Sequence, residues 1–454
     1  MRMMKLTQDT IAAQSTVSGE GGIAIIRISG PDSIGIIRKV FRSASGREPE
    51  PRHLQYGHVV WQGEVIDEVM AVLLPGRHTY TAEDMAEIQC HGSQFIVNRI
   101  LSVLMECGAR LAEPGEFSYR AFINGRIDLT QAEAVMRLIH SSGERSRRSA
   151  MRQMDGAVSR EIRKIQAELT NLSAGLAAYI DFPDEVDEAE TADNLHRKCL
   201  EMADRLEREC SEKKGRIEDE GIYVALCGKP NAGKSSLLNK LVGQERAIVT
   251  EIPGTTRDIL RESVMMNGIR FTLTDTAGLR ETDNPVEKIG VERAREAIDT
   301  ADVRILLIDS SEMPDDSVRK MIEETRPDLV LISKEDISRE EPSREILQMI
   351  GQIPFIQISA YSDTGVEELK KWLCDRADMD LSKEAVFSQT RHVEAAKRAA
   401  SHLRACAGSI ENEMPLDLVN IDLMAAMEEI GQVTGENATE TVIDRVFSQF
   451  CVGK

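Results

Sequence analysis

The segment Gly228–Ser236, with the sequence GKPNAGKSS, contains residue types that bind phosphate groups. It matches the pattern G-x-x-x-x-G-K-[ST] and stands between the apolar run GIYVALC and the helix-like run SSLLNKLVG, the context in which this pattern forms a P-loop. Gly228 and Gly233 allow tight turns around phosphate, and the amides at the helix start bind its oxygens. We expect Lys234 to contact the β- and γ-phosphates and Ser235 to bind Mg²⁺.

Two further motifs follow in the order that GTPases use. The segment PGTTRD, residues 253–258, offers the Thr256 hydroxyl as another Mg²⁺ ligand, and Asp275 of DTAG offers a carboxylate on the same side. The amide of Gly278 would bind the γ-phosphate. Leu279 comes next, where many GTPases carry the Gln that orients the attacking water, so another group must activate water if the chain hydrolyses GTP.

The tetrapeptide SKED, residues 333–336, resembles the Asn-Lys-x-Asp loop that reads guanine. Asp336 would accept hydrogen bonds from the guanine N1–H and amine, and adenine lacks this pair of donors. Ser333 replaces the usual Asn, which predicts a weaker tether between this loop and the P-loop. The predicted GTP-binding residues are Asn231, Ala232, Gly233, Lys234, Ser235, Ser236, Thr250, Glu251, Ile252, Pro253, Gly254, Thr255, Thr256, Asp275, Thr276, Ala277, Gly278, Ser333, Lys334, Asp336, Ser359 and Ala360.

The composition of the 454-residue chain argues against several classes of protein. A net charge of −20 disfavours broad contact with nucleic-acid backbones, so any RNA contact is expected to be local. The eight Cys show no paired spacing, which argues against a disulfide framework or zinc site and favours a reducing cytoplasm. The start MRMMKLTQDT does not read as a signal peptide, and no apolar run suits a membrane span, so we expect no membrane association.

The pattern of apolar and polar residues changes along the chain, which predicts four segments. Residues 1–118 mix strands with short helices, residues 119–218 are helical, residues 219–376 alternate strands and helices, and residues 377–454 are helical again. Apolar spacings of three and four across 151–179 predict one long helix. We expect a multidomain protein: an α+β N-terminal domain, a discontinuous helical domain and an inserted α/β Ras-like P-loop G domain.

Longer motifs resemble one family. PGEFSYRAFINGRIDLTQAEAV, YIDFPDE, GKPNAGKSSLLNKL, PGTTRDI, DTAGLRET and the terminal FCVGK stand in that order along the chain. They are similar to the bacterial and organellar tRNA-modification GTPases called MnmE or TrmE, and the resemblance covers essentially the whole chain.

The resemblance implies a reaction and partners. Members of this family work in the cytoplasm with a FAD-dependent partner, MnmG (GidA). They install an aminomethyl or carboxymethylaminomethyl group at C5 of the wobble uridine of certain tRNAs, with a one-carbon unit from 5-formyl- or methylene-tetrahydrofolate. GTP hydrolysis drives the cycle, and the family homodimerises through its N-terminal domain.

The resemblance also carries folate-site residues onto this chain. Arg27, Glu87, Arg126 and the terminal Lys454 match the family's folate positions, with Arg126 standing where Lys is common. A carboxylate suits the amide and amine of a pterin, and basic groups suit the carboxylates of a folate tail.

The same resemblance answers the question raised by Leu279. It implies a K⁺ ion held by Asn231, Thr250, Ile252 and Thr255, which supplies positive charge beside the phosphates. It also implies that Glu287 orients the attacking water, so that Glu287, Asn231 and Lys234 form the expected catalytic set.

Two other features are harder to assign. Arg145 opens RSRRSAMRQ, which with Arg160, Arg163 and Lys164 forms a basic helical face that is either solvated surface or an RNA phosphate contact. Cys451 in the terminal motif is either idle or a nucleophile.

Two alternatives to the modification enzyme stay open at this point. One is a ribosome-assembly-type GTPase switch without folate chemistry. The other is a dimeric scaffold that has lost turnover because Leu279 stands in place of Gln, although intact Lys234, Ser235 and Asp275 argue against this reading.

Overall fold

The chain forms two compact units, and each is described by itself. The computed structural model describes residues 9–141, 143–182, 188–244, 261–275, 295–311, 313–334, 343–359, 361–381 and 385–453. The first unit comprises Met1–Met136, Gln153–Leu200 and Arg398–Lys454, and the second comprises Arg137–Arg152 and Glu201–Lys397. This division does not test the four predicted domain boundaries, which stay a prediction.

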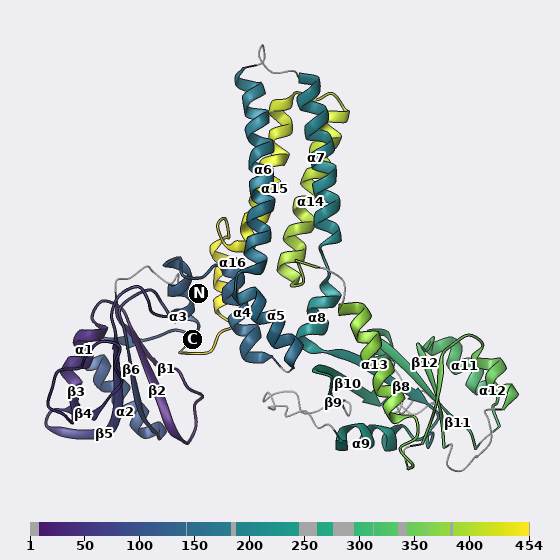
Figure 1. Ribbon diagram of the computed structural model, residues 1–454, viewed down its shortest axis with the longest axis horizontal. Coiled ribbons are helices and arrows are strands. Elements are labelled where there is room, and N and C mark those ends of the chain that lie inside the picture. Colours follow the sequence, from purple (N-terminus) through teal and green to yellow (C-terminus); the bar gives the residue numbers. More distant parts are fainter. Residues whose placement is uncertain are drawn as a thin grey trace, which may run out of the picture. The chain divides into compact units, whose positions relative to one another are not determined.

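A seven-stranded sheet lies at the N-terminal end of the first unit (Figure 1). Its order is β3-β4-β5-β6-β2-β1-β7, and every neighbouring pair is antiparallel except β1 and β7. The strands are β1 (Ile11–Gln14), β2 (Gly21–Ser29), β3 (Phe41–Ser43), β4 (Gln55–Trp61), β5 (Glu64–Leu74), β6 (Met85–Gly92) and β7 (Arg110–Leu111), and the two helices between them are α1 (Ser33–Val40) and α2 (Gln94–Glu106).

The two faces of this sheet have different roles. Side chains alternate between faces along a strand, so Ile26 and Ile28 of β2 and Ile88 of β6 pack with residues of α1 and α2 in one core. Arg27 of β2 and Glu87 of β6 point to the opposite face, where their side chains are 17% and 21% exposed.

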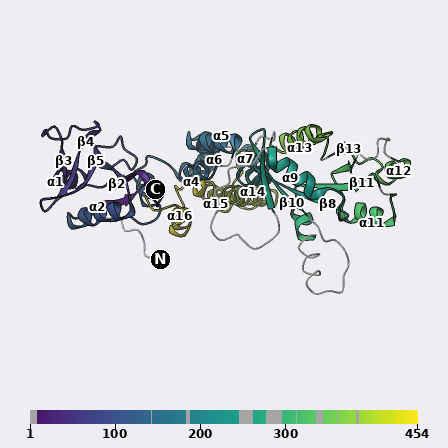
Figure 2. The same cartoon turned by 90° about the horizontal axis from the view of Figure 1, so that it is seen from below.

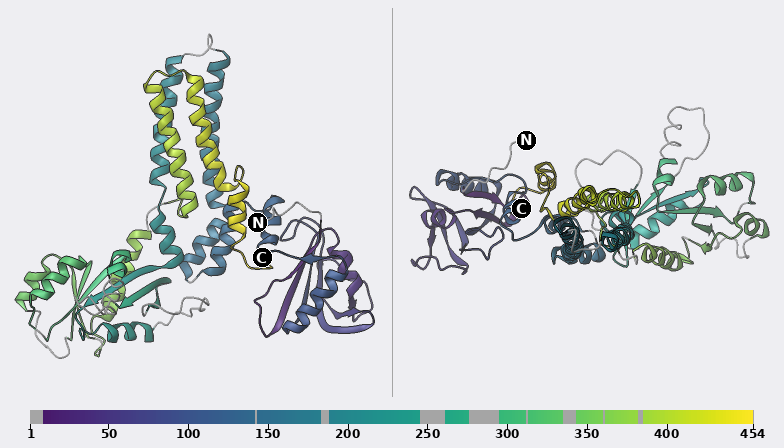
Figure 3. Two further views of the ribbon diagram at one scale, coloured as in Figure 1. Left: turned by 180° about the vertical axis from the view of Figure 1, so that it is seen from behind. Right: turned by 90° about the horizontal axis from the view of Figure 1, so that it is seen from above.

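The helical part of the first unit is built around two long helices, α6 and α15, which lie side by side (Figure 3). The sequence boundaries between the units fall within α4, α5, α7 and α14. The helices are α3 (Glu116–Ile123), α4 (Leu129–His140), α5 (Glu144–Met154), α6 (Ala157–Asp181), α7 (Glu188–Arg208), α14 (Thr390–Glu411), α15 (Leu416–Thr434) and α16 (Glu440–Phe447).

The prediction of one long helix across residues 151–179 is wrong at its beginning. Helix α5 ends at Met154 and α6 starts at Ala157, because Gly156 adopts a left-handed φ of 77° between them. The predicted apolar face of the helix is confirmed within α6, where Ile162 and Leu169 are fully buried.

The second unit contains a six-stranded sheet of order β13-β12-β11-β8-β10-β9, in which only β9 is antiparallel to its neighbour. This arrangement confirms the predicted α/β P-loop domain. Its strands are β8 (Ile222–Gly228), β9 (Arg261–Met266), β10 (Ile269–Asp275), β11 (Val303–Asp309), β12 (Leu329–Ser333) and β13 (Phe355–Ile358), and its helices include α8 (Glu212–Glu220), α9 (Lys234–Gln244), α11 (Asp316–Thr325), α12 (Arg344–Ile350) and α13 (Val366–Leu381).

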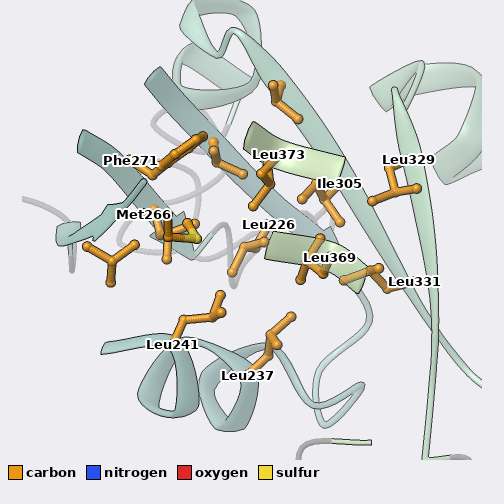
Figure 4. Packing of buried hydrophobic residues seen from close by; sticks show 14 of the residues in the cluster. Leu226, Leu237, Leu241, Met266, Phe271, Ile305, Leu329, Leu331, Leu369 and Leu373 are labelled. Atoms are coloured by element: carbon orange, nitrogen blue, oxygen red, sulfur yellow. The ribbon is translucent and has the colours of Figure 1, made fainter. Parts of the chain in front are cut away.

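Helices cover both faces of this sheet. On one face, Leu226 and Ile305 pack against Leu237 of α9 and Leu369 of α13 (Figure 4). On the other face, alternate strand residues pack against α11 and α12. The carboxyl ends of β8, β11 and β12 therefore meet at one edge, where parallel α/β sheets bind ligands.

The N-terminal sheet provides a matched pair of stability variants. Ile26→Ala should lower the free energy of unfolding by about 2–5 kcal/mol, because it opens a cavity in a fully buried position. Ile23→Ala on the same strand should change it by less than about 0.5 kcal/mol, because Ile23 is 67% exposed. Scanning calorimetry checks both, and equal shifts would contradict the assigned orientation of β2.

Candidate functional site

The P-loop has the backbone that its glycines predict. Gly228 adopts a φ of 143° and Gly233 a φ of 96°, and a Cβ on Gly228 would lie 2.5 Å from the carbonyl oxygen of Leu307. Asn231 also lies in the left-handed region, with a φ of 66°. Asn tolerates this conformation better than most residues, so the loop turns here without a third glycine.

Lys234 begins helix α9, and its side chain lies under the loop. Its ammonium donates hydrogen bonds to the carbonyl oxygens of Gly228 at 2.8 Å and Lys229 at 2.9 Å. Burial lowers the pKa of Lys234, and the nearby Asp275 carboxylate opposes this shift. The lysine is thus already directed into the loop, where phosphate oxygens would become its partners.

Ser235 and Asp275 come together at the predicted Mg²⁺ position. The Ser235 hydroxyl donates to Oδ2 of Asp275 at 3.1 Å. The other oxygen, Oδ1, is buried and has no hydrogen-bond partner among the described residues. A hydroxyl beside a carboxylate with one unsatisfied oxygen is the kind of oxygen donor set that Mg²⁺ prefers, so these residues fit the ion.

Ser333, the first residue of the predicted base-reading loop, lies next to the P-loop. The Ser333 hydroxyl is buried and donates to the carbonyl oxygen of Ala232 at 2.7 Å. Ser in place of Asn at position 333 predicted a weak tether between this loop and the P-loop. The Ser333–Ala232 hydrogen bond supplies a tether of a different kind. Ser359, at the end of β13, accepts hydrogen bonds from the amides of Tyr361 and Ser362, which fixes the neighbouring loop.

Several of the predicted nucleotide-, ion- and folate-binding residues are not among the residues that the structure describes. The following lie outside the described residues: Thr250, Glu251, Ile252, Pro253, Gly254, Thr255, Thr256, Thr276, Ala277, Gly278, Glu287, Asp336, Ala360 and Lys454. Among the expected K⁺ ligands, only Asn231 is described. These assignments stay predictions.

Three of the predicted folate residues lie close together on the side of the N-terminal sheet that faces away from α1 and α2. Arg27 lies directly opposite Glu87 in the register of β2 and β6, and its Nε is 3.0 Å from Oε1 of Glu87. The guanidinium groups of Arg27 and Arg126 lie 5.1 and 4.9 Å from the centroid of the Tyr80 ring. Sequence reasoning missed Tyr80, because a tyrosine in a loop gives no periodic signal.

A cluster of charged residues centred on the buried Glu116 and Arg120 fixes the helix beside this face. Glu116 of α3 accepts hydrogen bonds from Arg110 at 2.5 Å and Arg120 at 3.0 Å, and Arg120 also pairs with Asp9 at 2.6 Å. Burial alone would raise the pKa of Glu116, but the hydrogen bonds from Arg110, the Glu113 amide and Arg120 keep it below its ordinary value. The cluster holds α3 against the sheet edge.

The C-terminal tail returns to the N-terminal sheet (Figure 2). The Ser15 hydroxyl donates to the carbonyl oxygen of Gly453 at 3.1 Å, and the Gly115 amide donates to the Cys451 carbonyl at 3.3 Å. Gly453 has a φ of 91°, and a Cβ on it would lie 2.1 Å from the carbonyl oxygen of Gln14. The tail therefore comes back next to β1, one strand away from Arg27.

The predicted basic face, read from the sequence as either solvated surface or an RNA contact, is largely paired with acids. Arg147 and Arg148 both bond to Glu144, whose pKa their hydrogen bonds lower to about 2. Lys164 lies 2.6 Å from Glu161, and Arg145 lies 2.5 Å from Asp378. These contacts favour the solvated-surface reading of this face.

Within the part of the chain that the structure describes, no group of three or more His, Cys, Asp or Glu residues is arranged to hold a metal ion. In the same residues, no helix has the length and apolar character of a membrane span. Cys451 is exposed.

Comparisons with known proteins match both units. A family model described as the MnmE helical domain matches residues 129–451, and one described as the GTP-binding protein TrmE N-terminus matches residues 10–126. The tRNA modification GTPase MnmE of Natranaerobius thermophilus is 40% identical over 459 residues, covering 99% of this chain and 100% of that protein. The tRNA modification GTPase MnmE of Listeria welshimeri is 41% identical over 454 residues, covering 98% of this chain and 99% of that protein.

Among solved structures, the G domain of the T. maritima FeoB iron transporter is 30% identical. It covers 34% of this chain and 98% of that chain, with a TM-score of 0.28.

Proposed function

The chain belongs to the MnmE family of tRNA modification GTPases, and from this membership we propose that it hydrolyses GTP in the modification of tRNA. The observation that carries the proposal is the P-loop with Lys234 directed into it and Ser235 in contact with Asp275. These groups bind the phosphates and Mg²⁺ in other P-loop GTPases. The relatives match along the whole chain, which favours a modification enzyme over a ribosome-assembly switch.

The first prediction concerns guanine recognition. Asp336→Asn should weaken GTP binding about 10- to 100-fold and favour xanthine nucleotides, because the carboxylate that accepts two donors is lost. Competition binding with GTP, XTP and ATP measures the preference. An unchanged preference for GTP in this variant would remove Asp336 from the base site.

We further propose the partner, the modified nucleotide and the one-carbon donor of this reaction. The chain acts in the cytoplasm as a homodimer through its N-terminal domain. With the FAD-dependent MnmG, it installs a carboxymethylaminomethyl or aminomethyl group at C5 of the wobble uridine of certain tRNAs. A tetrahydrofolate derivative supplies the one-carbon unit. Family membership supports this proposal, and so does the convergence of Arg27, Glu87 and Arg126 around Tyr80.

The folate proposal assigns separate tasks to these residues. The Glu87 carboxylate is suited to the amide and amine of a pterin, and its pairing with Arg27 holds it in one orientation. Arg126, which also lies beside the Tyr80 ring, is suited to a carboxylate of the folate tail. Lys454 adds a further positive charge, since Gly453 already lies beside β1.

The second prediction tests the tail. Deleting residues 451–454 should weaken binding of 5-formyltetrahydrofolate about 10-fold, because one charge-assisted contact is lost, and should leave GTP binding unchanged. Calorimetric titration measures both ligands. Cys451→Ser serves as the control because it keeps Lys454, and it should bind folate normally. Equal folate affinity in the truncated protein would remove Lys454 from the site.

We propose that hydrolysis depends on K⁺ and on Glu287, since Leu279 can neither accept nor donate a proton. The Asn231 carbonyl, with Thr250, Ile252 and Thr255, would hold K⁺, which supplies positive charge near the leaving oxygen. Glu287 would orient the attacking water through a second water. The left-handed turn at Asn231 supports this role, because it is made by a residue that also carries an oxygen ligand.

The third prediction tests this mechanism. Wild-type turnover should be higher in KCl than in NaCl at matched ionic strength. Asn231→Ala should lose the difference, and Asn231→Gly should lose it too, because Gly keeps the backbone turn while removing the ligand oxygen. Glu287→Ala should retain GTP binding and lose about 100-fold or more in turnover. Phosphate-release assays provide the rates. Equal wild-type rates in the two salts would rule out K⁺ activation, and normal turnover of Glu287→Ala would rule out its role.

A further inference from the structure

Residues at the end of strand β11 contact the start of the proposed base-reading loop, the Ser333–Lys334 turn. Strands β11 and β12 are parallel neighbours, and Asp309 lies directly opposite Ser333 in their register. On its other side, β11 pairs with β8, where Leu307 lies opposite Gly228 of the P-loop. The residues that end β11 therefore lie between the two loops that hold the nucleotide.

Ser333 can make fewer contacts than the Asn that usually occupies its position. Its hydroxyl carries one proton, which is shared between the carbonyl oxygens of Ala232 at 2.7 Å and Ile308 at 3.3 Å. An Asn side chain carries two N–H donors and an acceptor. The Ser333 side chain therefore supplies one tether to the P-loop and has no second donor.

Ser310, at the end of β11, provides additional contacts. Its amide and its hydroxyl both donate to the carbonyl oxygen of Ser333, at 3.1 and 2.7 Å. These bonds fix the peptide that joins Ser333 to Lys334, and this peptide is the entry to the base-reading loop.

Asp309 holds the next residue. Its Oδ2 lies 2.5 Å from the ammonium of Lys334, and its Oδ1 accepts from the amide of Ser311 at 2.9 Å and the hydroxyl of Ser311 at 2.6 Å. The Asp309 side chain is only 8% exposed, so the carboxylate is fixed in place.

Lys334 needs such support, because it adopts a left-handed φ of 65°. A lysine in this region costs about 1 kcal/mol or more, so the surroundings must favour it. The turn at Lys334 sets the direction of the chain two residues before Asp336, the group expected to read guanine.

We propose that Asp309 and Ser310 are positioning residues for guanine recognition, and that they take over the part of the tether that Asn would supply in place of Ser333. The inference rests on the proposed GTPase function and identifies what sets its base specificity. Neither residue touches the nucleotide; both act through the Ser333–Lys334 turn.

The test uses the full-length protein and the fluorescent nucleotide mant-GDP. Asp309→Asn should raise the Kd for mant-GDP about 10-fold, because the charged partner of Lys334 is lost. It should also reduce the preference for GTP over ITP in competition, since ITP lacks the exocyclic amine and reports how well the loop is placed. Turnover at saturating GTP should stay at the wild-type rate.

Asp328→Asn is the matched control. Asp328 accepts from the amide of Arg304 at 2.9 Å, so it also links β11 to β12, but at the end of the strands away from the nucleotide. Its loss should leave the Kd and the GTP-to-ITP preference unchanged. Adding Ser333→Asn to Asp309→Asn should restore binding to within about 2-fold of wild type, because the amide's second donor replaces the lost tether.

Three results would overturn the inference: an Asp309→Asn variant that binds like Asp328→Asn, a weakened variant with an unchanged GTP-to-ITP preference, or no rescue by Ser333→Asn. A wild-type protein that binds no guanine nucleotide would overturn the proposed function and the inference together. If the wild-type protein binds guanine nucleotide and Asp309→Asn has the same Kd and the same GTP-to-ITP preference, the inference alone is overturned.

Discussion

The burial of the Lys234 ammonium at the carboxyl edge of the G-domain sheet is the constraint on which the nucleotide site depends. A buried ammonium must find acceptors, and here the carbonyl oxygens of Gly228 and Lys229 supply them. The loop directs these carbonyls inward only because its backbone turns at Gly228, Asn231 and Gly233. The loop is therefore already shaped for phosphate, whose charged oxygens would replace these neutral acceptors of Lys234.

On the face of the N-terminal sheet that carries Arg27 and Glu87, charged side chains are likewise held in place by partners. Arg27 and Glu87 satisfy each other across two strands, and the register of β2 and β6 places them opposite one another. Because both are held, a pterin would meet an oriented carboxylate rather than a mobile one, which lowers the entropy lost on binding. The return of Gly453 to β1 also places the described part of the tail one strand away from Arg27.

The sequence predicted the parts of the fold that follow from local pattern. Gly228, Gly233 and Lys234 stand at fixed spacing, so the P-loop could be located without a structure. The break at Gly156 was missed because the apolar spacing continues across it, and only the left-handed φ reveals the interruption. Tyr80 was missed because its role depends on two arginines that are distant in sequence.

The P-loop and the proposed base-reading loop each contain a non-glycine residue with a left-handed φ. The two residues are stabilised differently, and the second depends on a contact from a neighbouring strand. Asn231 and Lys334 both lie in the left-handed region. Asn has a short polar side chain that accepts this conformation at low cost, so the P-loop turn is largely self-sufficient. Lysine has no such preference, and its turn persists where Asp309 binds its ammonium. The strain at Lys334 is thus balanced by a contact from β11, and the strand that lies between the two loops becomes part of the structure that holds the base.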